Sequence, residues 1–441
     1  MSEFTTRYAA LNAPQKQAVD AIDGPVMVVA GPGTGKTELL SVRVANILQR
    51  TDTLPGNILC LTFTDSAALN MRQRLTSLLG PDAYKVAVHT FHSFGSEVIN
   101  TNGEYFYQGA HFRPADELSV YEILSSILGK LPHDNPLSSQ LNGRYTYLRD
   151  IQATISELKR GGLTPDELEH ILQRNAAFCE WLRPKLANAF NDRVSKKTYG
   201  LVRELVEAMR SYHEDALELA IYHPLATLLQ ESLERALTDA EANNTTKTIT
   251  AWKNAFLEKD AHGNWTLKDD KRGQKLRALQ AVYDDYLVAM QEAQLYDYDD
   301  MILRVVHALE VFDELRFSLQ EKYQYILVDE FQDTNDAQMR LIWNLTNNHA
   351  SAVRPNLMVV GDDDQAIYRF QGADLSNILD FTNRYRDVTV ITLTDNYRSA
   401  APILDLARTV IVQATERLEH TLEGVSKVLT PHHTPKSAFV G

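Results

Sequence analysis

The sequence has little cysteine and no long apolar run. Cys60 and Cys179 are its two cysteines and lie far apart in 441 residues, which excludes a disulfide framework and a cysteine-rich zinc site. No apolar stretch approaches the roughly 20 residues that a membrane-spanning helix needs, and the first residues lack the apolar core of a signal peptide. We therefore expect a cytoplasmic protein with no membrane partner.

Positive charge is also scarce, since 44 lysine and arginine residues stand against 58 aspartate and glutamate residues and give a net charge of −14. This acidity does not exclude a nucleic-acid partner. Salt screens exposed charges beyond about 8 Å, so a groove with its own basic residues still binds phosphates. The length allows roughly two to four domains.

Short apolar runs alternate with helical patterns, which is typical of a parallel α/β sheet. The expected strands cover residues 26–29, 58–63, 86–88, 325–328, 357–360 and 388–393. Between residues 111 and 295 long helical patterns replace the strands, and we expect prolines such as Pro165 and Pro184 to break these helices. The sequence therefore predicts a mostly helical domain inserted into a sheet domain.

The first chemical motif is a glycine-rich turn that follows the apolar run 26–29. Residues 30–37 read Ala-Gly-Pro-Gly-Thr-Gly-Lys-Thr, and an amphipathic pattern follows them. Such a turn directs backbone N–H groups at phosphate oxygens, and the helix that follows adds its positive end. The expected phosphate-binding residues are Gly31, Gly33, Thr34, Gly35, Lys36 and Thr37.

Within this turn Lys36 is expected to neutralise the outer phosphates of ATP, and Thr37 to hold Mg²⁺. Ala30 occupies a position where the strict pattern has glycine, so the backbone there must adopt a conformation open to alanine. A glycine-rich stretch alone is often only a turn. The preceding strand and the following helical pattern together favour an ATP site.

A second motif is the apolar run 325–328 followed by Asp329 and Glu330. Ligands of α/β sheets bind at the carboxyl ends of strands, where nucleotide hydrolysis needs one carboxylate for Mg²⁺ and one to deprotonate the attacking water. These roles suit Asp329 and Glu330 respectively. Acidic residues at a strand end are also common as solvated caps, and the phosphate loop makes the catalytic interpretation the better one.

A third motif is the expected strand 357–360, which leads into Gly361 and three aspartates, followed by Gln365, a neutral group suited to sensing a γ-phosphate. The three aspartates alternatively suggest a Ca²⁺ site, but the spacing of an EF-hand is absent. Tyr368 and Phe370 are two residues apart, so in an extended chain both rings point to the same side. They either stack on unpaired bases or fill the core between domains. The pair His432-His433 lacks further ligands at metal-binding spacing.

In this order the segments resemble the N-terminal part of superfamily 1 DNA helicases of the UvrD/Rep/PcrA type. Residues 11–18 resemble the Q motif, and residues 61–71 and 89–94 resemble motifs Ia and Ib. An aromatic and acidic segment at 296–302 precedes motif II. The remaining correspondences are 329–334 with motif II, 361–373 with motif III, 396–399 with motif IV and 155–165 with part of subdomain 1B.

The resemblance implies roles for individual residues. Gln15 would contact the adenine edge, Tyr397 would pack on the adenine, and Arg398 would reach the γ-phosphate. The residues implied to contact single-stranded DNA are Phe63, Thr64, Thr90, His92, Tyr368 and Phe370. Phe370 stands where several relatives carry tryptophan.

The resemblance also implies a RecA-like P-loop NTPase fold. Residues 1–110 and 296–385 would form motor domain 1A, 111–295 the helical subdomain 1B, and 386–441 the start of motor domain 2A. Motifs V and VI of the family are not found, so we expect an N-terminal fragment that is weak or inactive in unwinding.

The expected function is that of an ATP-dependent DNA helicase that moves 3′ to 5′ on single-stranded DNA, with ATP and Mg²⁺ as cofactors. Its partners would be single-stranded DNA and junctions of single- and double-stranded DNA. Two alternatives stay open: a nucleotide- and DNA-binding module without productive turnover, and the motor part of a helicase–nuclease.

Overall fold

The computed structural model describes residues 3–106, 112–212, 224–260, 262–268, 270–347, 354–367, 376–379, 381–414, 417–422 and 424–432. The chain divides into two compact units. Unit 1 comprises residues 1–112, 159–162 and 296–441, and unit 2 comprises 113–158 and 163–295. Among the described residues, no helix combines the length and the apolar character needed to cross a membrane.

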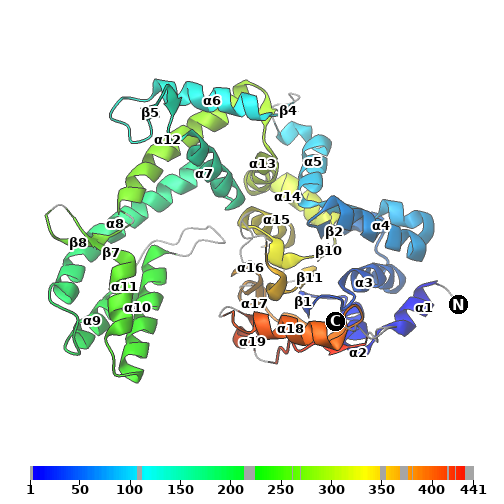
Figure 1. Cartoon of the computed structure of the whole chain (residues 1–441). Helices are drawn as coiled ribbons and strands as arrows, with labels where there is room; N and C mark the ends of the chain where they lie inside the picture. Colours follow the sequence, from blue (N-terminus) through cyan, green and yellow to red (C-terminus); the bar gives the residue numbers. More distant parts are fainter. Residues whose placement is uncertain are drawn as a thin grey trace. The chain divides into compact units, whose positions relative to one another are not determined.

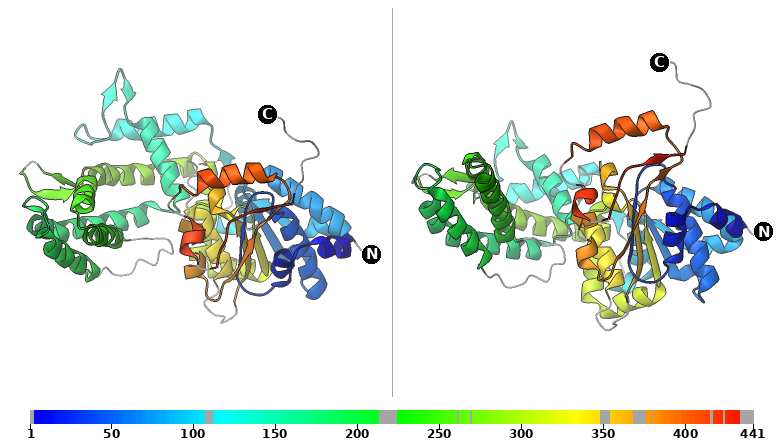
Figure 2. Two further views of the ribbon diagram at one scale, coloured as in Figure 1. Left: turned by 60° about the horizontal axis from the view of Figure 1, so that its bottom comes forward. Right: turned by 90° about the horizontal axis from the view of Figure 1, so that it is seen from below.

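Unit 1 is built on a six-stranded parallel sheet with helices on both of its faces (Figures 1 and 2). Its strands are β1 (Val26–Ala30), β2 (Ile58–Thr62), β3 (Ala87–Thr90), β10 (Tyr325–Val328), β11 (Asn356–Gly361) and β12 (Thr389–Leu393). They lie in the order β12-β1-β11-β10-β2-β3. The predicted α/β class and its six strands are confirmed.

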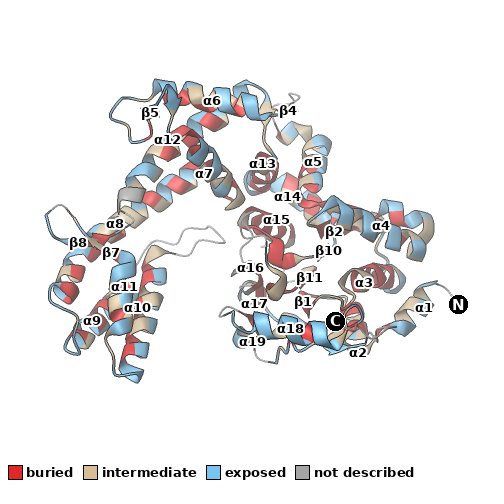
Figure 3. Ribbon diagram, viewed as in Figure 1, coloured by how far each residue is buried: buried red, intermediate tan, exposed pale blue. Residues whose placement is uncertain are grey.

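The sheet forms because its central strands are almost entirely apolar. Every residue of β1, β2 and β10 is buried, as a parallel sheet covered on both faces requires. Val28 lies opposite Val360 on one side and Ile391 on the other. The buried residues follow the strands and the inward faces of the helices (Figure 3).

Helices of unit 1 precede, connect and follow these strands. They are α1 (Glu3–Ala10), α2 (Ala13–Asp20), α3 (Lys36–Arg50), α4 (Asp65–Leu79), α5 (Phe91–Thr101), α13 (Tyr298–Val311), α14 (Asp313–Lys322), α15 (Asp336–Thr346), α16 (Ser376–Leu379), α17 (Phe381–Arg384), α18 (Ala401–Ile411) and α19 (Leu418–Thr421). Because the strands are parallel, the loops after them open at one edge of the sheet, where such folds bind ligands. The sheet extends to Leu393, past the boundary at 386 expected from the sequence.

Unit 2 consists mainly of helices. They are α6 (Glu117–Lys130), α7 (Leu148–Arg160, which ends in unit 1), α8 (Pro165–Phe190), α9 (Thr198–Arg210), α10 (Leu225–Ala242), α11 (Lys247–Phe256) and α12 (Asp270–Glu292). Two antiparallel hairpins accompany them, β5 (Gln140–Leu141) with β6 (Arg144–Tyr145), and β7 (Leu257–Lys259) with β8 (Trp265–Leu267). Two separate apolar cores hold this unit together.

Helix α8 corrects one expectation. Its start agrees with the sequence, since Thr164 caps it, Glu167 completes the capping box and Pro165 occupies the first turn. The break expected at Pro184 is wrong, because α8 continues through it to Phe190. Pro184 lies on the exposed side of the helix while Leu182 and Leu186 are buried, so packing outweighs the loss of one backbone hydrogen bond.

Residues 159–162 at the end of α7 belong to unit 1 and are fixed there by charge. Lys159 is fully buried, and its Nζ lies 2.6 Å from a carboxylate oxygen of both Asp297 and Asp300. Although burial acts to lower it, these carboxylates hold the pKa of Lys159 above its ordinary value. Arg340 donates a hydrogen bond of 2.6 Å to the Gly162 carbonyl.

Candidate nucleotide and nucleic-acid site

The glycine-rich turn lies between β1 and α3, as its sequence predicts. Ala30 is the last residue of β1 and pairs with Leu393, so the position that usually carries glycine has extended backbone that alanine adopts freely. Gly33 and Gly35 have φ angles of +72° and +86°, which favour glycine. The Thr34 hydroxyl donates to the Gly31 carbonyl at 2.8 Å and closes the turn from within.

A second loop, residues 395–398, is hydrogen-bonded to this turn. The Asn396 side-chain amide donates to the Pro32 carbonyl, and the Tyr397 backbone N–H donates to the Gly33 carbonyl at 2.9 Å. A Cβ atom at Gly33 would lie 2.7 Å from Cβ of Arg398, so glycine is needed here for space as well as for φ. Asn396, which has no predicted role of its own, is fully buried.

Residues from four loops line one cavity of about 180 Å³ at the carboxyl edge of the sheet. Seven of the predicted site residues are among those that line it: Gly33, Gly35, Lys36, Thr37, Glu330, Gln365 and Arg398. Lys36 Nζ lies 2.5 Å from Glu330 Oε2. The structure thus brings together the phosphate-loop lysine and the proposed base, which are 294 residues apart in sequence.

Two further charged residues, Glu38 and Arg74, also line this cavity and were not predicted. Arg74 lies on α4 and pairs with Glu38 of α3 at 2.5 Å. Neither residue belongs to a motif quoted from the sequence, and only the packing of α3 against α4 places them at the site.

The acidic residues beside the cavity are suited to a divalent cation. Burial, with a smaller contribution from Glu330, raises the pKa of Asp329 to about 6 and that of Asp333 to about 7. Asp333 Oδ1 is buried without a hydrogen-bond partner among the described residues. Carboxylate and hydroxyl oxygens are ligands that Mg²⁺ prefers, so Asp329 and Thr37 have the right chemistry for the predicted metal site.

Glu330 has an unusual backbone. Its φ is +49°, a left-handed conformation that costs free energy in any residue except glycine and that is concentrated at functional sites. Its N–H donates to Asp329 Oδ1 at 3.0 Å. The Gln332 side-chain amide donates to Glu330 Oε2 at 2.9 Å, so two donors, Lys36 and Gln332, approach the same oxygen.

The three aspartates of residues 362–364 are held by basic residues near the C-terminus. Lys427 Nζ lies 2.5 Å, 2.6 Å and 2.9 Å from oxygens of Asp362, Asp363 and Asp364, and Arg417 forms a bidentate pair with Asp364. Although burial acts against it, these carboxylates keep the pKa of Lys427 raised. An ammonium group already neutralises the cluster, so a Ca²⁺ site is disfavoured.

Both predicted adenine contacts, Gln15 and Tyr397, are hydrogen-bonded to the phosphate loop. Gln15 is buried, accepts a hydrogen bond from Asn12 N–H at 3.0 Å and donates to the Thr34 carbonyl at 2.9 Å. The Asn12 amide donates to the Tyr397 hydroxyl at 3.1 Å. His432 stacks on Tyr397, the predicted adenine contact, with ring centroids 5.1 Å apart.

The predicted DNA contacts follow β2 and β3, which are neighbours in the sheet. Thr64 caps α4 by accepting from Ala67 N–H, and Thr90 caps α5 by accepting from Ser93 N–H. Thr64 is exposed, Phe63 is partly exposed and Thr90 is buried. Both threonines therefore have structural roles at helix starts, and Thr90 offers little surface to DNA. Tyr368 and Phe370 lie outside the described residues.

His92 packs edge-to-face against the ring of Tyr298, with centroids 6.1 Å apart. Burial lowers the pKa of His92, which favours a neutral ring at physiological pH. Tyr298 is 70% exposed and adds an aromatic surface that was not among the predicted contacts.

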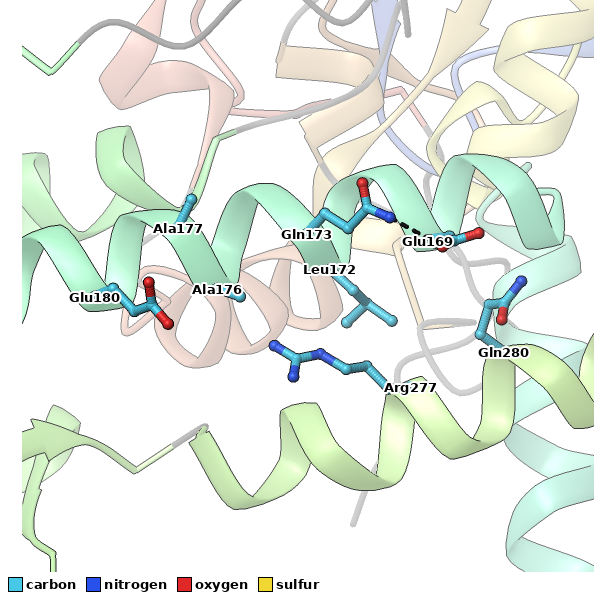
Figure 4. Close-up of a pocket in the computed structure, with 8 residues that line it drawn as sticks. All are labelled: Glu169, Leu172, Gln173, Ala176, Ala177, Glu180, Arg277 and Gln280. Carbon is cyan, nitrogen blue, oxygen red and sulfur yellow. Dashed lines mark hydrogen bonds between the residues drawn. The ribbon is translucent and has the colours of Figure 1, made fainter.

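Unit 2 has a cavity of its own. It has a volume of about 600 Å³, and Figure 4 shows it between α8 and α12. Its lining residues are Glu169, Leu172, Gln173, Ala176, Ala177, Glu180, Arg277 and Gln280. None of the predicted site residues is among them.

Comparison with known proteins agrees with this geometry. The model of the UvrD/REP helicase N-terminal domain matches residues 11–214 and 185–386. An ATP-dependent DNA helicase PcrA of Bacillus subtilis is 28% identical over 407 residues, covering 92% of this chain and 40% of the relative. An ATP-dependent DNA helicase UvrD1 of Mycobacterium bovis is 29% identical over 414 residues, covering 93% of this chain and 40% of the relative.

A DNA helicase II of Rickettsia typhi is 28% identical over 412 residues, with 93% of this chain and 46% of the relative covered. The chain thus spans less than half the length of these relatives. The family match covers most of the chain, including both halves of the sheet. The chain therefore belongs to the UvrD/REP helicase N-terminal domain family.

Proposed function

We propose that this chain carries the ATP-binding half of a DNA helicase that couples ATP hydrolysis to 3′-to-5′ movement on single-stranded DNA. The observation that carries the proposal is the Lys36–Glu330 pair of 2.5 Å in a cavity that Thr37, Gln365 and Arg398 also line. Phosphoryl transfer depends mainly on positioning and charge stabilisation, and these side chains supply both.

We assign each of these side chains a proposed role. Lys36 balances phosphate charge, Glu330 accepts a proton from the attacking water, and Gln365 and Arg398 face the outer phosphate. ATP bound with Mg²⁺ would supply the transferred phosphoryl group, with Thr37 and Asp329 as the oxygen ligands. Tyr397 and Gln15 are the proposed adenine contacts, as the family resemblance implies, and Gln15 would have to exchange its present hydrogen bonds to contact the adenine edge.

DNA is proposed to bind over the carboxyl ends of β2 and β3, through Phe63, Thr64, His92 and, to a smaller extent, Thr90. Among the described residues these positions share the sheet edge with the nucleotide cavity because all six strands are parallel. The direction of movement, and the contacts of Tyr368 and Phe370, rest on the family resemblance.

The direct test is hydrolysis of ATP by this chain with and without single-stranded DNA, measured as phosphate release under single-turnover conditions so that slow hydrolysis is detected. DNA-stimulated release supports the motor. ATP and DNA binding without release would instead support a binding module without turnover.

Replacing Lys36 with alanine is expected to weaken ATP binding itself, because the charge that faces the phosphates is lost. A titration with a fluorescent ATP analogue measures this affinity. Lys85→Ala is the matched control, since Lys85 is exposed and pairs with Asp82 outside the cavity. Equal affinity for ATP in Lys36→Ala and in the unmodified protein would contradict the assignment of the phosphate loop.

Replacing Phe63 with alanine is expected to reduce affinity for single-stranded DNA by about 5- to 150-fold, because stacking of one base on a ring contributes roughly 1–3 kcal/mol. Fluorescence anisotropy with a labelled oligonucleotide measures this loss. Phe317→Ala makes the same change at an exposed ring on α14 and should bind normally. Native affinity in Phe63→Ala, with the fold intact by circular dichroism, would contradict the stacking of a base on Phe63.

A further inference from the structure

Gln332 connects two parts of the nucleotide site. It lies in the short 3₁₀ helix η5 (Phe331–Asp333), directly after the two predicted catalytic carboxylates, and it is 2% exposed. No motif role was assigned to it from the sequence. Its side chain is neutral, so its contribution must come from the hydrogen bonds of its amide.

Both the nitrogen and the oxygen of that amide form hydrogen bonds. Gln332 Nε2 donates to Glu330 Oε2 at 2.9 Å, and Gln332 Oε1 accepts from the Asp362 backbone N–H at 2.9 Å. Nε2 also lies 3.4 Å from Asp333 Oδ2. One side chain therefore links the proposed base to the loop that follows β11.

The loop after β11 leads back to the same cavity. Asp362 Oδ2 accepts a hydrogen bond of 2.6 Å from Gln365 Nε2, and Gln365 lines the cavity with Glu330 and Lys36. The contacts form a path from Glu330 through Gln332 and Asp362 to Gln365. The proposed base Glu330 and the proposed γ-phosphate sensor Gln365 are thus joined by hydrogen bonds.

Gly361 makes room for this link. A Cβ atom at that position would lie 2.7 Å from Gln332 Oε1 and 3.2 Å from its backbone nitrogen. Any larger residue would displace the Gln332 amide. Burial of Gln332 and Asp362 makes the loss of either hydrogen bond costly, because a buried polar group would then be unsatisfied.

We propose that Gln332 is a positioning residue that holds the Glu330 carboxylate in its reactive orientation and couples it to the 361–365 loop. Glu330 needs such support because its backbone has a φ of +49°, and a strained conformation persists only where its surroundings fix it. The inference rests on the proposed function, since it assumes that Glu330 acts on the water that attacks ATP.

The test compares Gln332→Met with Gln332→Glu. Methionine keeps the length of the side chain and removes both hydrogen bonds, whereas glutamate keeps the acceptor for Asp362 N–H and removes the donor to Glu330. Both variants are expected to hydrolyse ATP about 10- to 100-fold more slowly in single turnover, as for a misplaced catalytic group, with little change in ATP affinity. Gln324→Met is the control, because Gln324 is exposed just before β10.

Hydrogen exchange provides a second readout that does not need turnover. The Asp362 amide is expected to exchange several-fold faster in Gln332→Met, since its acceptor is gone, and at nearly the unmodified rate in Gln332→Glu. Thermal unfolding shows whether each variant folds. If Gln332→Met does not fold, Gln332→Glu still tests the link to Glu330.

The outcomes separate the two proposals. Normal hydrolysis in Gln332→Met overturns the positioning of Glu330, and unchanged exchange at Asp362 overturns the coupling. If the unmodified chain releases no phosphate, the proposed turnover fails, and the exchange experiment alone then decides whether Gln332 joins the two loops.

Discussion

Glu330→Gln is expected to lower the rate of ATP hydrolysis at least about 100-fold while ATP affinity stays close to that of the unmodified chain. The substitution keeps the shape of the side chain and removes its basicity, and proton transfer by a positioned group contributes typically 10²–10⁴-fold in rate. Glu330 lies in the cavity beside Lys36, so its carboxylate is within reach of a bound phosphate chain. Single-turnover phosphate release and an ATP titration measure the two quantities.

The matched control for this experiment is Glu321→Gln, which makes the same change at an exposed position on α14 and should hydrolyse ATP normally. Unchanged hydrolysis in Glu330→Gln would remove Glu330 from the role of base. Asp333 would then be the next candidate, because its pKa of about 7 suits a group that accepts a proton near neutral pH.

The strands of unit 1 were predictable because their information is local. Fully buried parallel strands are short and apolar from end to end, and β1, β2 and β10 are buried at every residue, so each stands out from its flanking sequence. The helix break expected at Pro184 was wrong because the behaviour of this residue does not depend on local sequence. Its effect on α8 depends on the burial of Leu182 and Leu186 by other helices, which no local pattern reveals.

The residues of the site likewise divide into those that a local motif predicts and those that depend on distant partners. Lys36, Thr37, Asp329, Glu330 and Gln365 each follow a strand of the sheet, and the parallel topology alone brings them to one edge. Asn396, Gln332 and Lys427 have no predicted roles because each has at least one partner distant in sequence, as with Lys427 and Asp363, 64 residues apart. An asparagine or a lysine in a polar loop carries no signal that it will be buried against a carbonyl or a carboxylate.

Lys159→Met is expected to destabilise unit 1 by about 3–5 kcal/mol, the cost of leaving a buried charge without its partner. Lys159 is fully buried, and Asp300 is 1% exposed. Burial already raises the pKa of Asp300, and without the ammonium group this carboxylate must either remain charged in an apolar setting or take up a proton. Urea denaturation followed by circular dichroism measures the loss of stability.

An exposed lysine, Lys85, provides the comparison for this prediction. Lys85→Met removes the ion pair between Lys85 and Asp82, whose side chains are 67% and 56% exposed, and such surface pairs contribute about 0–1 kcal/mol. The double variant Lys159→Met with Asp300→Asn removes one buried charge along with its partner, so it should be less destabilised than the sum of the two single variants. If Lys159→Met costs no more than Lys85→Met, the charge of Lys159 contributes nothing to the place of residues 159–162 in unit 1, and packing and the Arg340 hydrogen bond hold them there.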